Sequence, residues 1–263
     1  MTTKSLVKLA VNASIRAGKR ILEVYDSEFA IEHKDDKSPL TEADKRSHEA
    51  ISSYIDESHI PILSEEGRQI EFEERSKWNK FWLVDPLDGT KEFIKRNGEF
   101  TVNIALIEND YPVLGVIYVP VQNTLYVGVV GEGAWKFENI ESTDDVKDYM
   151  SGTPLPIAQN RSEYIMVGSR SHMSAETEEY MAKLKEEKGH VEILSRGSSL
   201  KLCMVAEGSA DEYPRFAPTM EWDTGAGHAI CKAAGLKVDQ YPEMTELKYN
   251  KEDLLNPWFL VHK

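Results

Sequence analysis

Apolar residues recur every three or four positions in two stretches near the start of the chain, which is the spacing of one helix face. The first stretch spans residues 4–25. The second begins at Thr41-x-x-Asp44, a pattern similar to a capping box with Asp in the place of Glu. We therefore expect one helix over 4–25 and another from Thr41 to about Tyr54.

Continuous apolar runs of strand length follow at residues 81–84, 101–107, 113–119 and 125–130. Short turns at Asn109-Asp110 and Gln122-Asn123 separate the last three runs. This arrangement predicts an antiparallel meander in the first half of the chain.

The second half alternates between the two kinds of element. Strands are expected at 164–168, 191–194 and 258–261, and helices at 174–188, 198–207 and 222–234. Gly208 and Gly235 follow the last two helices, as is typical of helix ends. The polar, acidic residues 138–156 between the halves are the best linker candidate. The pattern predicts an α+β protein of stacked layers, divided into 1–150 and 151–263.

The run at 81–84 ends abruptly in Asp85-Pro86-Leu87-Asp88-Gly89-Thr90. Pro and Gly mark a tight turn here, and such a turn can direct Asp85, the Leu87 carbonyl and Asp88 to one small region. Hard cations such as Mg2+ bind oxygen ligands of this kind. Asp, Pro and Gly also form ordinary turns for local reasons, so this segment alone leaves both interpretations open.

Three more acids stand at the ends of predicted elements: Asp44, Glu65 and Asp223. Each has a local explanation, because Asp44 can cap its helix, Asp223 can favour the positive end of a helix, and Glu65 can be a surface charge. If all five carboxylates converged, each close pair would repel by roughly 4 kcal/mol, and several such repulsions exceed what a marginally stable fold tolerates. Bound divalent cations would offset most of this repulsion.

Composition narrows the class of protein. The 263 residues are 41% hydrophobic and 29% charged, as in globular proteins. No apolar run approaches the ~20 residues of a membrane span, and the N-terminus lacks a signal-peptide core. We expect a cytoplasmic protein and leave weak peripheral contact with the inner membrane open. The net charge of −14 argues against a nucleic-acid polymer as partner, but not against a small anion that binds beside a cation.

The acids in this order resemble the inositol monophosphatase superfamily of Mg2+-dependent, lithium-sensitive phosphatases. The resemblance spans nearly the whole chain. Further segments are similar to its bacterial 3'(2'),5'-bisphosphate nucleotidase branch: residues 91–100, Ser169-Arg170-Ser171-His172, Gly197-Ser198-Ser199-Leu200-Lys201 and Tyr213-Pro214-Arg215-Phe216. The resemblance implies a layered αβαβα sandwich, with most metal ligands in 1–150 and with Asp223 and the nucleotide-side residues in 151–263.

The resemblance also implies a two-metal mechanism, with two or three Mg2+ ions per site. Glu65, Asp85 and the Leu87 carbonyl would hold one ion, and Asp85, Asp88 and Asp223 a second. Thr90 and Asp44, with Glu65, would activate the attacking water. On the substrate side, the implied residues are Asp88, Gly89, Thr90, Lys91, Ser169, His172, Gly197, Lys201, Arg215 and Asp223. Arg170 and Arg196 are further candidates for a 5'-phosphate contact.

The function implied is hydrolysis of the 3'-phosphate of adenosine 3',5'-bisphosphate, and of its 5'-phosphosulfate relative, in support of sulfate assimilation. Several of the substrate-side residues have a plain alternative as solvated charges or loop residues. Two other functions stay open: an inositol or sugar monophosphatase, and a non-catalytic metal- or nucleotide-binding module. The sequence does not predict the oligomeric state.

Overall fold

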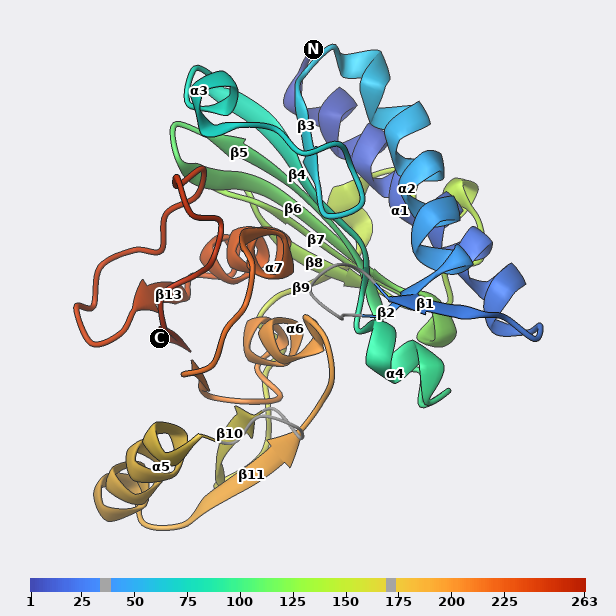
Figure 1. The fold of residues 1–263 in the computed structure, drawn as a ribbon. Helices are drawn as coiled ribbons and strands as arrows, with labels where there is room; N and C mark the ends of the chain where they lie inside the picture. Colours follow the sequence, from blue (N-terminus) through green and yellow to red (C-terminus); the bar gives the residue numbers. More distant parts are fainter. Residues whose placement is uncertain (34–38, 169–173) are drawn as a thin grey trace.

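A seven-stranded sheet forms the centre of the computed structural model, which describes residues 1–33, 39–168 and 174–263 (Figure 1). The strand order is β3-β4-β5-β6-β7-β8-β9, with β3 parallel to β4 and every other neighbour antiparallel. The meander predicted over 101–130 is confirmed. The strands are β3 (Ile62–Ser64), β4 (Lys80–Asp88), β5 (Thr101–Glu108), β6 (Tyr111–Val119), β7 (Thr124–Val129), β8 (Gly133–Phe137) and β9 (Thr153–Pro154).

Helices α1 (Thr3–Tyr25) and α2 (Glu42–Ile55) cover one face of this sheet (Figure 1). Both agree with the predicted helices, and Thr41 and Asp44 form the expected capping box. Side chains alternate across the sheet: Trp82 and Val84 belong to the core beneath α1 and α2, whereas Phe81 and Leu83 belong to a second core on the opposite face. This alternation explains the uninterrupted apolar run at 81–84, because both of its faces are buried.

Helix α7 (Glu221–Ala233) lies against the second face at unusually short range. A Cβ added to Gly115 on β6 would stand 2.2 Å from the carbonyl oxygen of Ala226, and one added to Gly128 on β7 would stand 2.5 Å from the Cα of Ile230. Only glycine permits this approach of helix to sheet. The contact fixes where the first turn of α7, and therefore Asp223, lies relative to the sheet.

The C-terminal half alternates as predicted. Strands β10 (Tyr164–Gly168) and β11 (Val191–Ser195) are parallel, and β12 (Tyr213–Arg215), β14 (Phe259–His262) and β13 (Lys237–Gln240) form an antiparallel sheet. Helix α6 (Leu200–Glu207) lies beside α7, and α5 (Ala175–Lys188) lies beyond β10 and β11 (Figure 1). The layered α+β class is confirmed. The remaining short elements are β1 (Ile31–His33), β2 (Pro39–Thr41), α3 (Phe72–Arg75) and α4 (Thr90–Ile94), with 3-10 turns at Asp56–Ser58, Pro120–Gln122, Thr143–Asp145 and Tyr149–Ser151.

The interpretation of residues 138–156 as a linker is wrong. Ile140 and Tyr149 are buried in the core beneath α1 and α2, and the Tyr149 ring meets Trp135 edge-on at 5.5 Å. Strand β9 continues the central sheet by pairing with β8. The segment is rich in acidic residues, and this composition suggested a linker although two of its apolar side chains belong to the core. The division into 1–150 and 151–263 stays a prediction.

Candidate active site

The Asp-rich segment lies at the end of β4, where the strand bulges. Asp85 pairs with Asn103 and Asp88 with Thr101, so three steps on β4 match two on β5. Such a bulge re-aims side chains. The Leu87 N–H donates to Asp85 Oδ1 at 3.0 Å, and Ser47 on α2 donates to the Pro86 carbonyl at 2.6 Å. The turn is therefore held from within and from α2.

Three carboxylates meet at this bulge. Oxygens of Asp85, Asp88 and Asp223 lie within 4.8 Å of one another, although Asp223 is more than 130 positions away in the sequence. Asp85 is only 1% exposed. Burial and the charges of Glu65, Asp88 and Asp223 raise the pKa of Asp85. The pKa of Asp223 is raised to about 8, mainly by burial and secondly by the charge of Asp88. Three of the predicted metal ligands, Asp85, Asp88 and Asp223, therefore converge, and the charge of Glu65 acts on two of them.

This cluster suits a hard divalent cation. All its donors are oxygens, as Mg2+ requires. Burial, and then the charges of the neighbouring acids, shift the pKa values of Asp85 and Asp223 against ionisation, and a bound divalent cation would favour their charged forms. The residues present therefore fit the metal that the sequence predicted.

Asp44 and Thr90 form a hydrogen-bonded pair next to the bulge. Asp44 Oδ2 accepts from the N–H and the hydroxyl of Thr41, both at 2.7 Å. Its other oxygen, Oδ1, accepts from Thr90 Oγ1 at 3.3 Å. Thr90 Oγ1 also lies 3.4 Å from the Leu87 carbonyl. Asp44 thus caps α2 and also contacts Thr90. Its role as a helix cap is therefore compatible with the predicted role in water activation.

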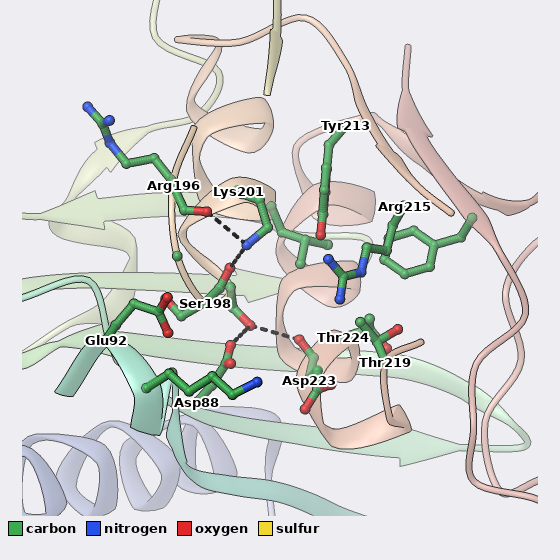
Figure 2. A pocket seen from close by; sticks show the side chains of 16 residues that line it. Asp88, Glu92, Arg196, Ser198, Lys201, Tyr213, Arg215, Thr219, Asp223 and Thr224 are labelled. Carbon is green, nitrogen blue, oxygen red and sulfur yellow. Dashed lines mark hydrogen bonds between the residues drawn. The ribbon is translucent and has the colours of Figure 1, made fainter. Parts of the chain in front are cut away.

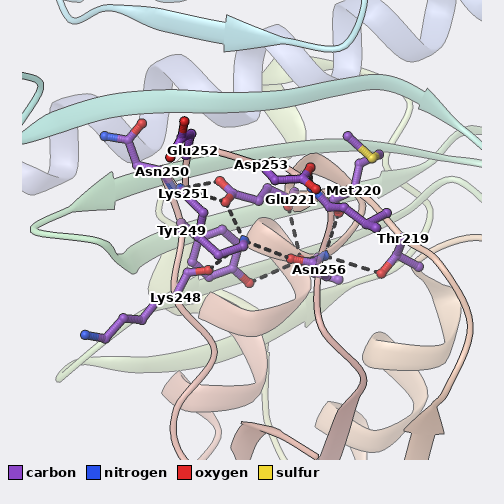
Figure 3. Close-up of polar contacts among 12 residues, drawn as sticks. Thr219, Met220, Glu221, Lys248, Tyr249, Asn250, Lys251, Glu252, Asp253 and Asn256 are labelled. Atoms are coloured by element: carbon purple, nitrogen blue, oxygen red, sulfur yellow. Dashed lines mark hydrogen bonds and ion pairs between the residues drawn. The ribbon is translucent and has the colours of Figure 1, made fainter. Parts of the chain in front are cut away.

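The segment that leads into α7, ahead of Asp223, is fixed by a hydrogen-bond network that the sequence did not predict (Figure 3). The Met220 N–H donates to Asp223 Oδ2 at 2.8 Å. The neighbouring Glu221 is 0% exposed, forms an ion pair with Lys251 at 2.5 Å and accepts the N–H of Asn250 at 2.7 Å. Asn256 donates to the Met220 carbonyl at 2.8 Å. The loop that precedes β14 thereby anchors the first turn of α7.

A cleft of about 150 Å³ opens beside the cluster (Figure 2). Asp88 and Asp223 lie at one end of it, and Lys201 and Arg215 lie toward the other. Its lining includes the predicted residues Asp88, Gly89, Lys91, Arg196, Gly197, Lys201, Arg215 and Asp223. Glu92, Tyr213 and Thr219 also line it and were not predicted. Glu65 borders a neighbouring hollow instead. Ser169, Arg170 and His172 lie outside the described residues.

Two cations of the cleft are only partly satisfied by the protein. Lys201 Nζ donates to the carbonyls of Ser198 at 2.5 Å and Arg196 at 3.3 Å, and burial lowers its pKa to about 8. Arg215 donates from Nη2 to the Pro218 carbonyl at 2.9 Å. Its Nε is buried and has no hydrogen-bond partner among the described residues. Both side chains retain donors for an anionic ligand.

Gly197 allows the cleft wall to approach residues 92–99, which follow the Asp-rich segment. A Cβ there would lie 2.6 Å from Glu92 Cγ and 2.9 Å from the Glu99 carbonyl oxygen, so a side chain would push the wall away. Its N–H donates to Glu99 Oε2 at 2.9 Å. Gly89, on the opposite side, has a φ of +96°, which favours glycine. The two glycines let residues 89–99 lie against residues 197–198, which are distant in the sequence.

Known proteins resemble this chain over almost its full length. A sequence model of the inositol monophosphatase family matches residues 3–258. A 3'(2'),5'-bisphosphate nucleotidase, CysQ of Salmonella typhimurium, is 47% identical over 250 residues, 93% of this chain and 94% of that protein. The crystal structure of CysQ from Bacteroides thetaiotaomicron has 51% identity and a TM-score of 0.91, covering 99% of this chain and 97% of its own. An inositol monophosphatase from Anabaena (Nostoc) shares the fold, with 24% identity, a TM-score of 0.72 and coverage of 100% and 92%.

Proposed function

The chain belongs to the inositol monophosphatase family, and from this premise we propose that it is a Mg2+-dependent phosphatase that removes the 3'-phosphate of adenosine 3',5'-bisphosphate to leave AMP. The observation that carries the proposal is the cleft that joins the carboxylate cluster at one end to Lys201 and Arg215 at the other. An ester with one phosphate for each end matches this distribution of charge.

The carboxylate end would hold the metal and the phosphate that is cleaved. Asp85, Asp88, Asp223, Glu65 and the Leu87 carbonyl are the proposed ligands, in an arrangement of two or three ions. When bound, such ions supply Lewis acidity, lower the pKa of water and neutralise charge on the leaving oxygen.

The proton of the attacking water would pass to the pair formed by Thr90 and Asp44. The Thr90 hydroxyl donates to Asp44 Oδ1, which leaves the Thr90 oxygen free to accept a hydrogen bond from water. Asp44 Oδ2 is already held by two donors from Thr41, so the carboxylate cannot rotate freely. The pair is therefore preset to orient a nucleophile, which a pure binding module does not require.

The opposite end would recognise the 5'-phosphate. Lys201 is nearly inaccessible to solvent, and burial disfavours its charged form. A phosphate at the cleft would supply the missing counter-charge, and the unpaired donors of Arg215 suit its oxygens. We also propose that the backbone N–H groups of Gly89 and Thr90 contact the cleaved phosphate.

Phosphate release from a substrate panel tests the proposal. Adenosine 3',5'-bisphosphate is expected to be hydrolysed faster than inositol 1-phosphate, only with Mg2+, and with inhibition by tens of millimolar LiCl. Faster release from the inositol ester would reassign the substrate and leave the metal site intact. Tight binding of the nucleotide without turnover would favour a binding module.

A further inference from the structure

Ser199 occupies a position that the proposed mechanism does not use. It stands just before α6 and is 2% exposed. Its Oγ lies 2.6 Å from Asp88 Oδ2 and 2.7 Å from the backbone carbonyl of Asp223. One hydroxyl therefore contacts two residues of the carboxylate cluster, which come from β4 and α7, while its own segment forms the wall of the cleft.

Asn103 on β5 determines how the Ser199 hydroxyl is oriented. Thr101 Oγ1 donates to Asn103 Oδ1 at 2.9 Å, which turns the amide NH2 toward Ser199 at 2.9 Å and Asp88 Oδ2 at 3.3 Å. Ser199 accepts from Asn103 and keeps a single hydrogen to donate. A charged carboxylate is the stronger acceptor, so the hydrogen is directed to Asp88 in preference to the Asp223 carbonyl.

We propose that Ser199 is a positioning residue that fixes the Asp88 carboxylate for metal binding, and that Asn103 orients Ser199 for this task. With Oδ2 of Asp88 held by both side chains, Oδ1 is the oxygen available to an ion. Partners of metal ligands of this kind change metal affinity or activity by about 10–100-fold when removed. The inference rests on the metal site of the proposed function.

A purely structural role would predict something different. Ser199 and Asn103 are both buried, and buried polar groups need partners in any fold. Loss of such a group lowers the melting temperature of the metal-free protein without changing how tightly the folded protein binds Mg2+. Metal affinity, measured directly rather than through turnover, separates the two roles.

Isothermal titration of Mg2+ into the full chain is the test, with Ser199→Ala compared with Ser209→Ala. Ser209 lies just beyond the other end of α6, where its hydroxyl contacts the Met204 carbonyl at 3.2 Å and Glu207 Oε1 at 2.8 Å. We expect Ser199→Ala to raise the Kd for Mg2+ about tenfold and Ser209→Ala to leave it within twofold. A Ser199→Ala value within twofold of wild type would overturn the proposal.

Asn103→Ala removes the partner of Ser199 that lies on β5. This variant replaces Ser199→Ala in the test if Ser199→Ala does not fold. It should raise the Kd in the same direction, and the double variant should change it by less than the product of the two single effects, because the residues act on one carboxylate. If the change in Kd of the double variant equals the product of the two single changes, the proposed network is contradicted. Failure of the wild type to bind Mg2+ would overturn the proposed metal site itself, whereas wild-type binding that neither variant alters would overturn this inference alone.

Discussion

The two ends of the cleft hold their charges in opposite ways. At the carboxylate end, protein donors hold individual acids: Thr41 holds Asp44, Ser199 holds Asp88, and the Met220 N–H holds Asp223. At the cationic end, Lys201 and Arg215 donate hydrogen bonds to backbone carbonyls. The acids therefore accept hydrogen bonds from side chains and from backbone N–H groups, whereas the cations donate to backbone carbonyls.

Burial shifts the two ends in opposite directions. It raises the pKa values of Asp85 and Asp223 and lowers that of Lys201. Each end would therefore favour a ligand of opposite sign, a cation at one end and a phosphate at the other. The protein fixes the geometry in advance and leaves neutralisation to the ligands, so the two ends should respond differently to mutation and pH.

The largest effect is expected from Asp88→Asn, which removes one charge from the carboxylate end. The rate should fall by about 10²–10³-fold, as when an electrostatic group is removed from the transition state, and equally for every substrate. Because the change also relieves repulsion among buried acids, the melting temperature without Mg2+ should not fall. Activity assays and thermal denaturation check both parts. A loss confined to bisphosphate substrates would contradict the assignment.

Lys201→Met should produce a smaller and substrate-dependent loss. It removes a charge that would contact the 5'-phosphate, and hydrogen bonds to charged groups contribute about 1.5–3 kcal/mol. We expect kcat/KM for adenosine 3',5'-bisphosphate to fall about 10–100-fold, with little change for adenosine 3'-monophosphate. Equal losses for the two substrates would show that Lys201 supports the metal centre rather than a second phosphate.

The pH dependence should be the smallest of these effects. Because the pKa of Lys201 is lowered to about 8, its ammonium is present below that value and is lost as the pH rises through it. The KM ratio of the bisphosphate to the 3'-monophosphate should therefore rise between pH 7 and pH 9. Lys201→Arg, which stays protonated, should flatten this ratio. A ratio independent of pH in the wild type would argue against a charge contact there.

The carboxylate end was largely predictable from the sequence because its signals are local. An apolar run that ends in Asp-Pro-x-Asp-Gly predicts a tight turn after residue 84, but β4 continues to Asp88 and a bulge after Asp85 redirects the side chains instead. The Thr41-x-x-Asp44 spacing likewise gives a capping box directly. That Asp223 joins them follows from the family resemblance and not from local patterns, because its position depends on α7 packing against Gly115 and Gly128.

The supports of the site could not be predicted in the same way. Ser199, Glu221 and Asn256 act through contacts that span 24 to 111 positions in the sequence, and no local spacing indicates such partners. Asn103 did carry a signal, since it is a polar residue inside the apolar run 101–107 and is 1% exposed. The error at 138–156 has a related cause, because its acidic composition concealed the buried Ile140 and Tyr149.

The central claim is that acids distant in sequence share a pocket that a divalent cation completes, and thermal denaturation with Mg2+ tests it most directly. Because the pKa values of Asp85 and Asp223 are raised, the stability linked to their protonated forms is complete near pH 4 and is lost as the pH rises toward 8. Mg2+ competes with these protons, so its effect should be larger at pH 8.5 than at pH 6.

At ten times its Kd, Mg2+ should stabilise the fold by about 1.4 kcal/mol, or about 3–6 °C for a chain of this size, and by clearly less in Asp88→Asn. A melting temperature that Mg2+ leaves unchanged at pH 8.5, with or without phosphate, would contradict the account.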